Sequence, residues 1–187
     1  MYDINAFIEA AQAENLFVLL RPGPYICAEH NGGGLPFWLY QMYPNITLRS
    51  SDPDYLKEVD QWWAVLLPKI QPHLYINGGN VLMIQLENEY GSYGLQTGTC
   101  DVKYIVHLHD LVRKYLGPEV LMYTTDGDGD GYLRCGKTQG AYATIDFGPG
   151  ANATVAFQTQ RHFEPRGPLV NSEFYPGTVE FFQDYFK

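Results

Sequence analysis

The sequence predicts an α/β fold in which about five of the eight strand–helix units of a TIM (β/α)8 barrel are present. Three observations lead to this prediction. Short apolar runs alternate along the chain with segments whose apolar residues recur at helical spacing. The runs are apolar on both faces, as expected for parallel strands that helices cover. Several of them lead directly into charged side chains, and (β/α)8 enzymes place their chemistry at the C-terminal ends of their strands.

The chain is too short for a complete barrel. Eight strands and eight helices take about 250 residues, whereas this chain has 187. We therefore expect one incomplete catalytic domain over residues 1–187, without a second domain. The first residues enter a helical pattern at once and lack the basic start and apolar stretch of a signal peptide, as if the chain were cut from a longer one.

Three helices are predicted from capping residues and apolar spacing. Asp3, Asp52 and Asp101 are the expected N-caps, Pro53 suits the first position of the second helix, and Pro68 should end or kink that helix. The expected apolar faces are Ile4, Phe7, Ile8 and Ala11 in the first helix, Tyr55, Val59, Trp62 and Leu66 in the second, and Tyr104, Ile105, Leu108, Leu111, Val112 and Tyr115 in the third.

Five apolar runs are the expected strands. Each is short, and each is followed by a residue that can take part in chemistry. The predicted strands cover residues 16–20, 81–86, 120–125, 141–145 and 168–171. The residues at their C-terminal ends are Arg21, Glu87, Asn88, Glu89, Asp126, Asp146, Ser172 and Glu173. In a parallel sheet all of these ends meet at one edge, so we expect these side chains to gather there.

The overall charge argues against two classes of function. The net charge is −9 and the isoelectric point is about 4.9. Nucleic-acid binding needs a basic footprint, and so does binding to an anionic membrane surface. A membrane-spanning helix needs about 18 consecutive apolar residues, and the sequence has no run approaching that length. We therefore expect neither a nucleic-acid partner nor a membrane span.

The cysteines and two glycosylation sequons bear on the compartment. The chain has three cysteines, Cys27, Cys100 and Cys135. In a reducing compartment all three would be free thiols, whereas in an oxidising one we expect one disulfide and one leftover thiol. Asn45 and Asn152 each begin an Asn-X-Thr triplet and would accept glycans in a secreted protein.

No metal or cofactor is expected. Residues 126–131 spell DGDGDG and resemble the start of a calcium loop, but the twelfth position holds Lys137 and not the required glutamate. A turn between a strand and a helix is the preferred interpretation. His107 and His109 are two residues apart on a predicted helix and would point to different sides.

Carboxylates at strand ends are the candidates for catalysis. Glycoside hydrolysis needs one carboxylic acid to protonate the leaving oxygen and a second carboxylate to attack the anomeric carbon or activate water. Neighbouring buried carboxylates would separate in pKa and so supply both forms. Spacing alone does not choose a pair among the six candidates, which are Glu29, Glu87, Glu89, Asp126, Asp146 and Glu173.

Several long motifs resemble family 35 of the glycoside hydrolases, and most closely its animal lysosomal β-galactosidases. These motifs occur in order along nearly the whole chain. They are RPGPYICAE (21–29), GGLPFWL (33–39), SSDPDYL (50–56), QLENEYGSY (85–93), YTTDG (123–127) and NSEFY (171–175). The resemblance implies a TIM barrel of which this chain holds strands 3 to 7. It also implies an enzyme that releases terminal β-D-galactose from β-galactosides with retention, by double displacement.

The resemblance also assigns roles to individual residues. It implies that Glu89, in the Asn-Glu pair, is the general acid/base and that Glu173, in the Ser-Glu-Phe motif, is the nucleophile. Asn88 would bond the sugar 2-hydroxyl. The further galactose-binding residues that it implies are Cys27, Ala28, Glu29, Glu87 and Tyr175.

The resemblance further implies a disulfide between Cys100 and Cys135, which leaves Cys27 as a thiol in the pocket. The sequence departs from the family in two places. His30 stands where members usually carry Trp, and Pro176-Gly177-Thr178 replaces a segment with another usual Trp. Both departures concern the acceptor side of the pocket.

Other functions stay open. The chain could be a catalytically silent relative that binds galactosides or a protein, because an incomplete barrel exposes sheet edges. Related barrels use the same carboxylates on glucosides or hexosaminides, so the preference for galactose depends on the resemblance. A glycan or small galactoside is the expected partner, and a lysosomal or secreted location is implied by the family. The sequence predicts no oligomeric state.

Overall fold

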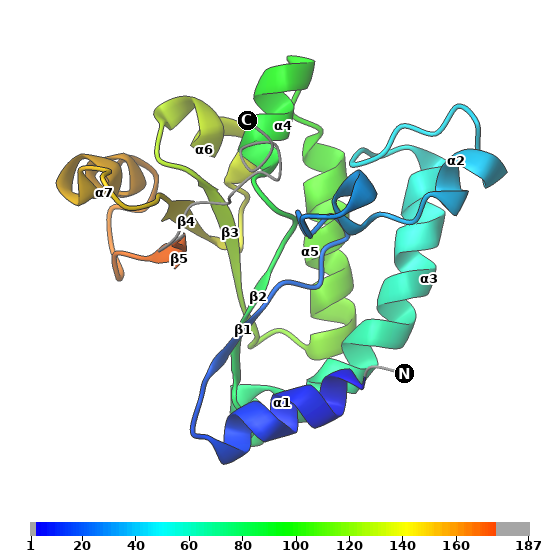
Figure 1. The fold of residues 1–187 in the computed structure, drawn as a ribbon, viewed down its shortest axis with the longest axis horizontal. Coiled ribbons are helices and arrows are strands. Elements are labelled where there is room, and N and C mark those ends of the chain that lie inside the picture. Colours follow the sequence, from blue (N-terminus) through cyan, green and yellow to red (C-terminus); the bar gives the residue numbers. More distant parts are fainter. Residues whose placement is uncertain (1–2, 175–187) are drawn as a thin grey trace, which may run out of the picture.

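The computed structural model describes residues 3–174. Within this range five parallel strands form one sheet in their order along the chain. Figure 1 shows the sheet curling into a half-barrel with helices around it, which confirms the predicted partial TIM barrel. The strands are β1 (Val18–Leu20), β2 (Val81–Gln85), β3 (Leu121–Gly127), β4 (Tyr142–Asp146) and β5 (Asn171–Glu173).

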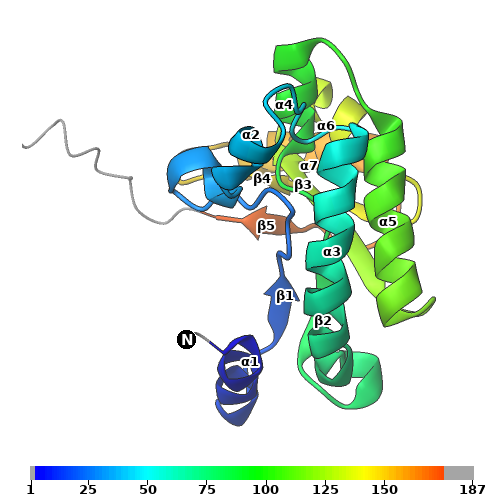
Figure 2. The ribbon, with the colours of Figure 1, turned by 90° about the vertical axis from the view of Figure 1, so that its right-hand side faces the viewer.

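The helices connect successive strands and cover the outside of the sheet. The longest two, α3 and α5, pack side by side, as Figure 2 shows. Short 3-10 turns complete the connections. The α-helices are α1 (Ile4–Ala13), α2 (Trp38–Met42), α3 (Pro53–Ile70), α4 (Tyr90–Thr97), α5 (Val102–Leu116), α6 (Asp130–Gly136) and α7 (Ala153–Phe163). The 3-10 turns are η1 (Asn31–Gly34), η2 (Gln71–His73) and η3 (Tyr75–Asn77).

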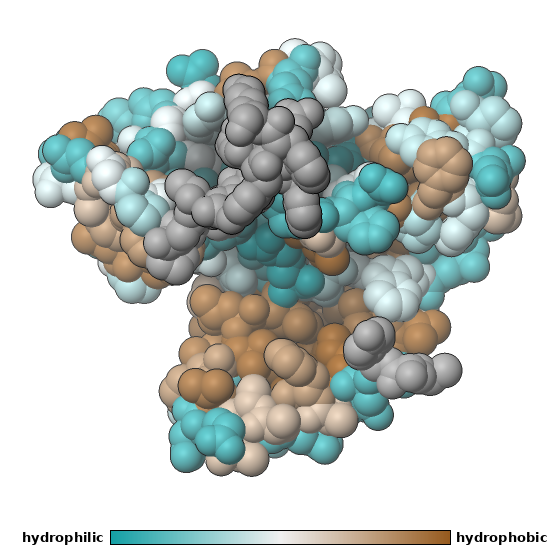
Figure 3. All heavy atoms as spheres, viewed as in Figure 1, coloured by the Kyte–Doolittle hydropathy of each residue, from teal (hydrophilic) through white to brown (hydrophobic). Residues whose placement is uncertain are grey.

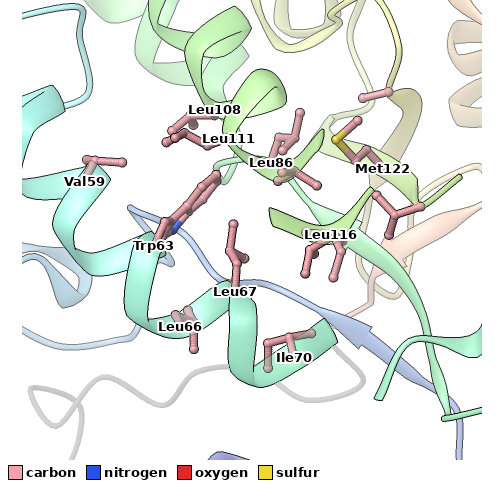
Figure 4. Close-up of a cluster of buried hydrophobic side chains, with 14 of the residues drawn as sticks. Val59, Trp63, Leu66, Leu67, Ile70, Leu86, Leu108, Leu111, Leu116 and Met122 are labelled. Carbon is pink, nitrogen blue, oxygen red and sulfur yellow. The ribbon is translucent and has the colours of Figure 1, made fainter. Parts of the chain in front are cut away.

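The main core lies between α3, α5 and the central strands. Trp63 and Leu67 of α3 are fully buried and face Leu108 of α5 and the strand residue Met122 (Figure 4). Fully burying one such side chain contributes about 1.5–3 kcal/mol. This packing fixes β2 and β3 against two long helices, so the residues that follow these strands are carried by the main core.

The three predicted N-caps are confirmed. The Asp3 side chain accepts hydrogen bonds from the backbone N–H groups of Asn5 and Ala6 at 3.0 and 3.5 Å. Asp52 does the same for Asp54 and Tyr55, with Pro53 at the first helical position. Asp101 accepts from the N–H of Tyr104 at 3.1 Å. Each cap satisfies donors that a helix start otherwise leaves unpaired.

The predicted apolar face of α3 was wrong at one position. Trp62 is 52% exposed, whereas its neighbour Trp63 is fully buried. Trp62 and Trp63 lie three and four residues after Val59, and both spacings fit a helical stripe. Packing against α5 decides in favour of Trp63. The helix also runs on through Pro68 to Ile70. Pro68 is exposed, so the carbonyl that loses its hydrogen bond can be solvated.

The predicted apolar face of α1 is only partly buried. Ile8 has 1% exposure, but Phe7 is 74% exposed. Leu16, Phe17 and Leu19, on and before β1, are exposed as well. Figure 3 shows a hydrophobic region over the part of the molecule that contains α1 and β1. None of the helices within residues 3–174 has the length and apolar character needed to cross a membrane.

The last strand begins three residues later than predicted, at Asn171. Pro168 has no N–H to donate, and its carbonyl accepts from the Tyr142 hydroxyl at 2.7 Å. The N–H of Val170 donates to the side chain of Gln160 at 3.0 Å and so is not available to β4. The Pro168 carbonyl and the Val170 N–H therefore pair outside the sheet, and contact with β4 begins at the Val170 carbonyl, which accepts from the N–H of Ile145 at 3.2 Å.

Helices α2, α4 and α7 were not predicted, and α6 was expected only as a helix of unstated bounds after the DGDGDG turn. Two of these four helices are rich in glycine, which disfavours helix formation in isolation: α4 has the sequence YGSYGLQT and α6 the sequence DGYLRCG. These two helices pack against each other, and a disulfide links Cys135 of α6 to Cys100 in the segment after α4. Tertiary contacts therefore decide their conformation.

Candidate active site

The C-terminal ends of the strands bring the candidate carboxylates to one edge of the sheet. Asp146 on β4 is the register partner of Glu173 on β5 and of Gly127 on β3. The segment after β2 contains Glu89, whose N–H donates to the carbonyl of Thr125 on β3 at 3.1 Å. Arg21 follows β1 directly. Glu89 and Glu173, far apart in sequence, thus lie at the same edge.

Glu89 is held at the N-cap of α4 in a left-handed conformation, with φ 44° and ψ 46°. The Nδ2 of Asn88 donates to its carboxylate at 3.2 Å. Burial raises the pKa of Glu89, and the negative charge of Glu173 raises it further, against the opposing effects of Asn88, Arg21 and Arg49. A raised pKa favours the protonated carboxyl, which is the form that a general acid needs.

Glu173 lies on the edge strand and is paired with a cation. Arg21 donates from Nη2 to its Oε2, and the two side chains are 25% and 14% exposed. Arg21 is itself fixed by bonds to the carbonyl of Ile26 at 3.1 Å and to Gln85 at 3.4 Å. The electrostatic surroundings of Glu173 therefore differ from those of Glu89, which has no ion pair within the described residues.

Two aspartates extend the carboxylate group. Burial raises the pKa of Asp146 to about 7, with further contributions from the charges of Glu89 and Glu173. Burial also raises the pKa of Asp126 well above its usual value, although the N–H of Gly91 donates to it at 2.7 Å. Asp126 has no exposed surface. The pKa values of Glu89, Asp126 and Asp146 are thus all raised at one site, and a raised pKa favours the protonated carboxyl that acid catalysis requires.

Glu87 is the most enclosed of the candidates. It has no exposed surface, and both carboxylate oxygens are engaged. Arg49 donates to it twice, at 3.0 and 2.6 Å, the Tyr104 hydroxyl once, at 2.9 Å, and the Asn88 N–H once, at 2.7 Å. Asn88 is 1% exposed and bonds Gln85 as well as Glu89.

The segment after β1 presents the remaining candidates. Cys27 is half-buried and is a free thiol, and Ala28 and Glu29 are exposed. Both Cys27 and Glu29 are left-handed, with φ 51° and 48°. The Tyr25 ring packs so closely on Gly33 that a Cβ there would lie 2.0 Å from the ring, so this turn requires glycine. Tyr175 lies outside the described residues.

Unusual backbone conformations are concentrated around this site. Six non-glycine residues among those described have positive φ, and all but Asn15 surround the carboxylates. These five are Cys27, Glu29, Arg49, Glu87 and Glu89. Such conformations cost about 1–3 kcal/mol each, persist only where surrounding contacts enforce them, and cluster at functional sites.

The disulfide that the resemblance implied is present between Cys100 and Cys135, with a Cα–Cα distance of 5.1 Å. It links the segment after α4 to α6. Gly94 of α4 lies directly beneath it, because a Cβ there would be 2.4 Å from the Cys135 sulfur. Closing a loop of 35 residues stabilises a fold by about 3–4 kcal/mol in the chain-entropy model.

The DGDGDG segment forms the predicted strand-to-helix turn, since β3 ends at Gly127 and α6 begins at Asp130. Within residues 3–174 no group of three His, Cys, Asp or Glu side chains is arranged to hold a metal ion. Arg49 and Tyr104 were not predicted as site residues. Neither belongs to a chemical motif, and the contact of Arg49 with Glu87 spans 38 positions.

Comparisons with known proteins show the family of this chain. The family model "Glycosyl hydrolases family 35" matches residues 1–186. The chain is 57% identical over 178 residues to "Beta-galactosidase" of Canis lupus familiaris and 52% identical over 179 residues to that of Homo sapiens. It is 56% identical over 179 residues to "Beta-galactosidase-1-like protein" of Mus musculus. These matches cover 95–96% of this chain and 26–27% of the relatives, so the chain spans about a quarter of their length.

Proposed function

This chain belongs to family 35 of the glycosyl hydrolases, and on that premise we propose that it carries the catalytic pair of a retaining β-galactosidase. Glu89 is the general acid/base and Glu173 is the nucleophile. The substrate is a glycan or small galactoside with a terminal β-D-galactose. The relatives named β-galactosidase support this choice of sugar.

The proposed reaction has two steps. In the first, Glu173 attacks the anomeric carbon, and the bond from that carbon to the aglycone oxygen breaks as Glu89 protonates the oxygen. In the second, Glu89 removes a proton from water, the water oxygen bonds to the anomeric carbon, and Glu173 leaves as a carboxylate. Two inversions give β-galactose with retained configuration, and this mechanism requires carboxyl groups about 5–5.5 Å apart.

One observation carries the proposal. Burial and the charge of Glu173 raise the pKa of Glu89, while the Arg21 guanidinium pairs with Glu173. One carboxyl is thus favoured as a proton donor, and the other has a cation beside it that stabilises its negative charge. These are the two states that double displacement needs before the first step.

The supporting residues have two proposed roles. We propose that Cys27, Ala28, Glu29 and Tyr175 contact galactose and that Asn88 bonds its 2-hydroxyl. Glu87 was expected from the resemblance to touch the sugar, but contacts from Arg49, Tyr104 and Asn88 occupy both of its carboxylate oxygens and favour a different role. We propose that it supports the acid/base segment from behind.

The test is hydrolysis of a chromogenic β-galactoside at acidic pH by the purified chain and by Glu173→Gln. The variant keeps the size of the side chain but removes the nucleophilic charge, so we expect at least a ~10³-fold lower rate. Equal rates in the two proteins would contradict catalysis by this chain. An NMR spectrum of the first product should show β-galactose, and α-galactose would contradict the retaining mechanism.

A lysosomal or secreted location is part of the proposal. The disulfide between Cys100 and Cys135 suits an oxidising compartment. Asn45 and Asn152 are both exposed, as glycan acceptors must be. Expression in a secreting animal cell, followed by glycosidase treatment, should lower the apparent mass of the chain. An unchanged mass would argue against glycosylation at either site.

A second candidate function is galactoside or protein binding without turnover. The exposed apolar side chains of α1 and β1, with the hydrophobic region in Figure 3, favour it, because exposed apolar patches commonly mark contact surfaces. An unmodified chain that binds a non-hydrolysable galactoside analogue but hydrolyses the chromogenic substrate no faster than Glu173→Gln would support this candidate over the enzyme.

A further inference from the structure

Arg49 lies in the loop before α3 and reaches the segment that carries Glu89. Its side chain is 12% exposed. Its Nε donates to Oε1 of Glu87 at 3.0 Å and its Nη2 to Oε2 at 2.6 Å, which is a two-pronged carboxylate contact. The same Nη2 also donates to the backbone carbonyl of Asn88 at 2.7 Å. One guanidinium therefore holds both a side chain and the main chain of the acid/base segment.

Aromatic rings hold the guanidinium itself. Its central carbon lies 3.9 Å from the ring centre of Tyr25 and 4.5 Å from that of Tyr93. The Tyr90 ring is farther, at 5.8 Å, but its hydroxyl donates to the Arg49 carbonyl at 3.1 Å. The Tyr93 hydroxyl donates to the carbonyl of Leu48 at 2.9 Å. Residues from the loop after β1 and from helix α4 therefore both contact Arg49.

The backbone that Arg49 contacts is the one most in need of support. Glu87 and Glu89 have φ of 62° and 44°, and Asn88 lies between them. Left-handed non-glycine residues persist only where the surroundings enforce them. The Asn88 carbonyl bond fixes the chain direction between the two left-handed residues. The bonds to the Glu87 carboxylate fix the first of these two residues. Together the two contacts therefore set the direction in which the Glu89 side chain leaves the main chain.

We propose that Arg49 is a positioning residue that fixes the Glu87–Asn88–Glu89 turn and thereby aims the Glu89 carboxyl at the leaving oxygen. This inference rests on the proposed function of Glu89 as the acid. Arg49 acts through Glu87 and Asn88 and does not itself contact the reacting atoms. Its planar fork is required, because a lysine ammonium cannot hold two carboxylate oxygens and a carbonyl while stacked on Tyr25.

Leaving-group dependence tests this role. A misplaced general acid slows the departure of a poor leaving group such as phenol, whereas dinitrophenol departs without a proton. A general acid contributes about 10²–10⁴-fold to rate. For Arg49→Met we therefore expect kcat/KM to fall about 100-fold or more on phenyl β-galactoside and at most a few-fold on dinitrophenyl β-galactoside. Arg49→Lys should fall between this variant and the unmodified chain on phenyl β-galactoside.

The matched control is Arg113→Met. Among residues 3–174, the hydrogen bonds of the Arg113 side chain on α5 go to the backbone carbonyls of Pro118, Val120 and Gly140, at the opposite ends of the strands. Arg113→Met should change kcat/KM on both β-galactosides by the same factor. Circular dichroism confirms that each variant is folded before the rates are compared.

A second variant keeps the test decisive if Arg49→Met folds poorly. Removing Arg49 leaves the buried Glu87 without its cation, and this unpaired charge is destabilising. Arg49→Met combined with Glu87→Gln removes both charges and should unfold at a higher temperature than Arg49→Met alone. It should keep the selective loss on phenyl β-galactoside, because the contact with the Asn88 carbonyl is still missing.

Each outcome either supports or overturns the positioning role of Arg49. A selective loss on phenyl β-galactoside supports the positioning role. Equal losses on both substrates in Arg49→Met and in the double variant, or full activity in either, would overturn it. An unmodified chain that hydrolyses neither substrate would contradict the proposed function itself, and the inference would fall with it.

Discussion

The ends of β2 and β5 carry the two proposed catalytic carboxylates, and they are built differently. The end of β2 is interior: it is flanked by β1 and β3, and Glu89 is followed directly by α4. Asn88, Arg49 and the β3 backbone all contribute bonds to the segment. β5 is an edge of the described sheet, and the Glu173 side chain is held there by Arg21.

This difference matches what each carboxyl is proposed to do. An acid/base must stay in one place through two steps while its proton leaves and returns, and redundant supports allow the left-handed backbone that aims it. A nucleophile needs a nearby cation and a short path to carbon, and one arginine can supply the cation. We therefore expect single changes near β5 to have large effects and single changes at the margin of the β2 end to have small ones.

The largest effect is expected for Arg21→Met. This change removes the cation beside Glu173 and frees the carboxylate to turn away. Losing one preorganised group of this kind lowers kcat by about 10²–10³-fold. Because attack on carbon is common to all substrates, kcat/KM should fall equally for phenyl and dinitrophenyl β-galactosides. Steady-state kinetics on both substrates measure this.

The comparison with Arg49→Met sharpens the assignment. Arg21→Met should lower kcat/KM equally on both substrates, whereas Arg49→Met should lower it selectively on phenyl β-galactoside. If Arg21→Met were selective instead, Arg21 would act through Glu89, and the division of labour between the two strand ends would be wrong. Little change in either substrate would show that Glu173 needs no single anchor.

A smaller effect is expected for Asp146→Asn, the neighbour of Glu173 on β4. Burial, with the charges of Glu89 and Glu173, raises the pKa of Asp146 to about 7, whereas an unfolded aspartate titrates near about 3.9. The folded state thus binds a proton more tightly than the unfolded state. The stability that the protonated Asp146 carboxyl contributes is therefore complete below about pH 4 and is lost as pH rises to about 7.

Asp146→Asn cannot ionise, so it should be more stable than the unmodified chain at about pH 7, by up to a few kcal/mol, and the difference should shrink toward about pH 4. Urea unfolding at a series of pH values measures this. Asp128→Asn is the control, because Asp128 is exposed and near the same site. Parallel pH profiles for Asp146→Asn and the unmodified chain would show that Asp146 is as easily ionised folded as unfolded.

Local patterns explain how much of the fold was predictable. Caps and long apolar stripes act within a few residues, so the starts of α1, α3 and α5 could be predicted. The phase of α3 could not be predicted, because Trp62 and Trp63 both fit helical spacing. Likewise, the start of β5 depends on Gln160 binding the N–H of Val170, a contact between two elements that no local pattern shows.

The candidate site divides in the same way. The apolar runs indicated that carboxylates gather at strand ends, but choosing Glu89 and Glu173 among six needed the motifs. Arg49 could not be predicted from either source of information. It lies in an ordinary polar loop, and its partners come from the segments after β1 and β2 and from α4. Residues that act by holding others are recognised only once the chain is folded.

The smallest effect is expected for Asp101→Ala, at the margin of the β2 end. Asp101 caps α5 and also accepts from the N–H and hydroxyl of Ser51, at 2.6 and 2.7 Å, which ties down the loop that carries Arg49. Losing such a cap costs about 1 kcal/mol. Although burial opposes it, hydrogen bonding from Ser51 and Tyr104 lowers the pKa of Asp101.

Because its pKa is lowered, the ionised Asp101 carboxylate contributes its full stabilisation above about pH 4, and this stabilisation is lost as pH falls below that value. Its pH dependence is therefore opposite to that of Asp146. The loss in Asp101→Ala should therefore be measurable by urea unfolding at about pH 7 and shrink in acid. Because Tyr25, Tyr90 and Tyr93 still hold the Arg49 side chain, we expect the ratio of phenyl to dinitrophenyl hydrolysis to stay within about twofold. A selective loss as large as that of Arg49→Met would mean that the β2 end has no redundancy, and the contrast with β5 would disappear.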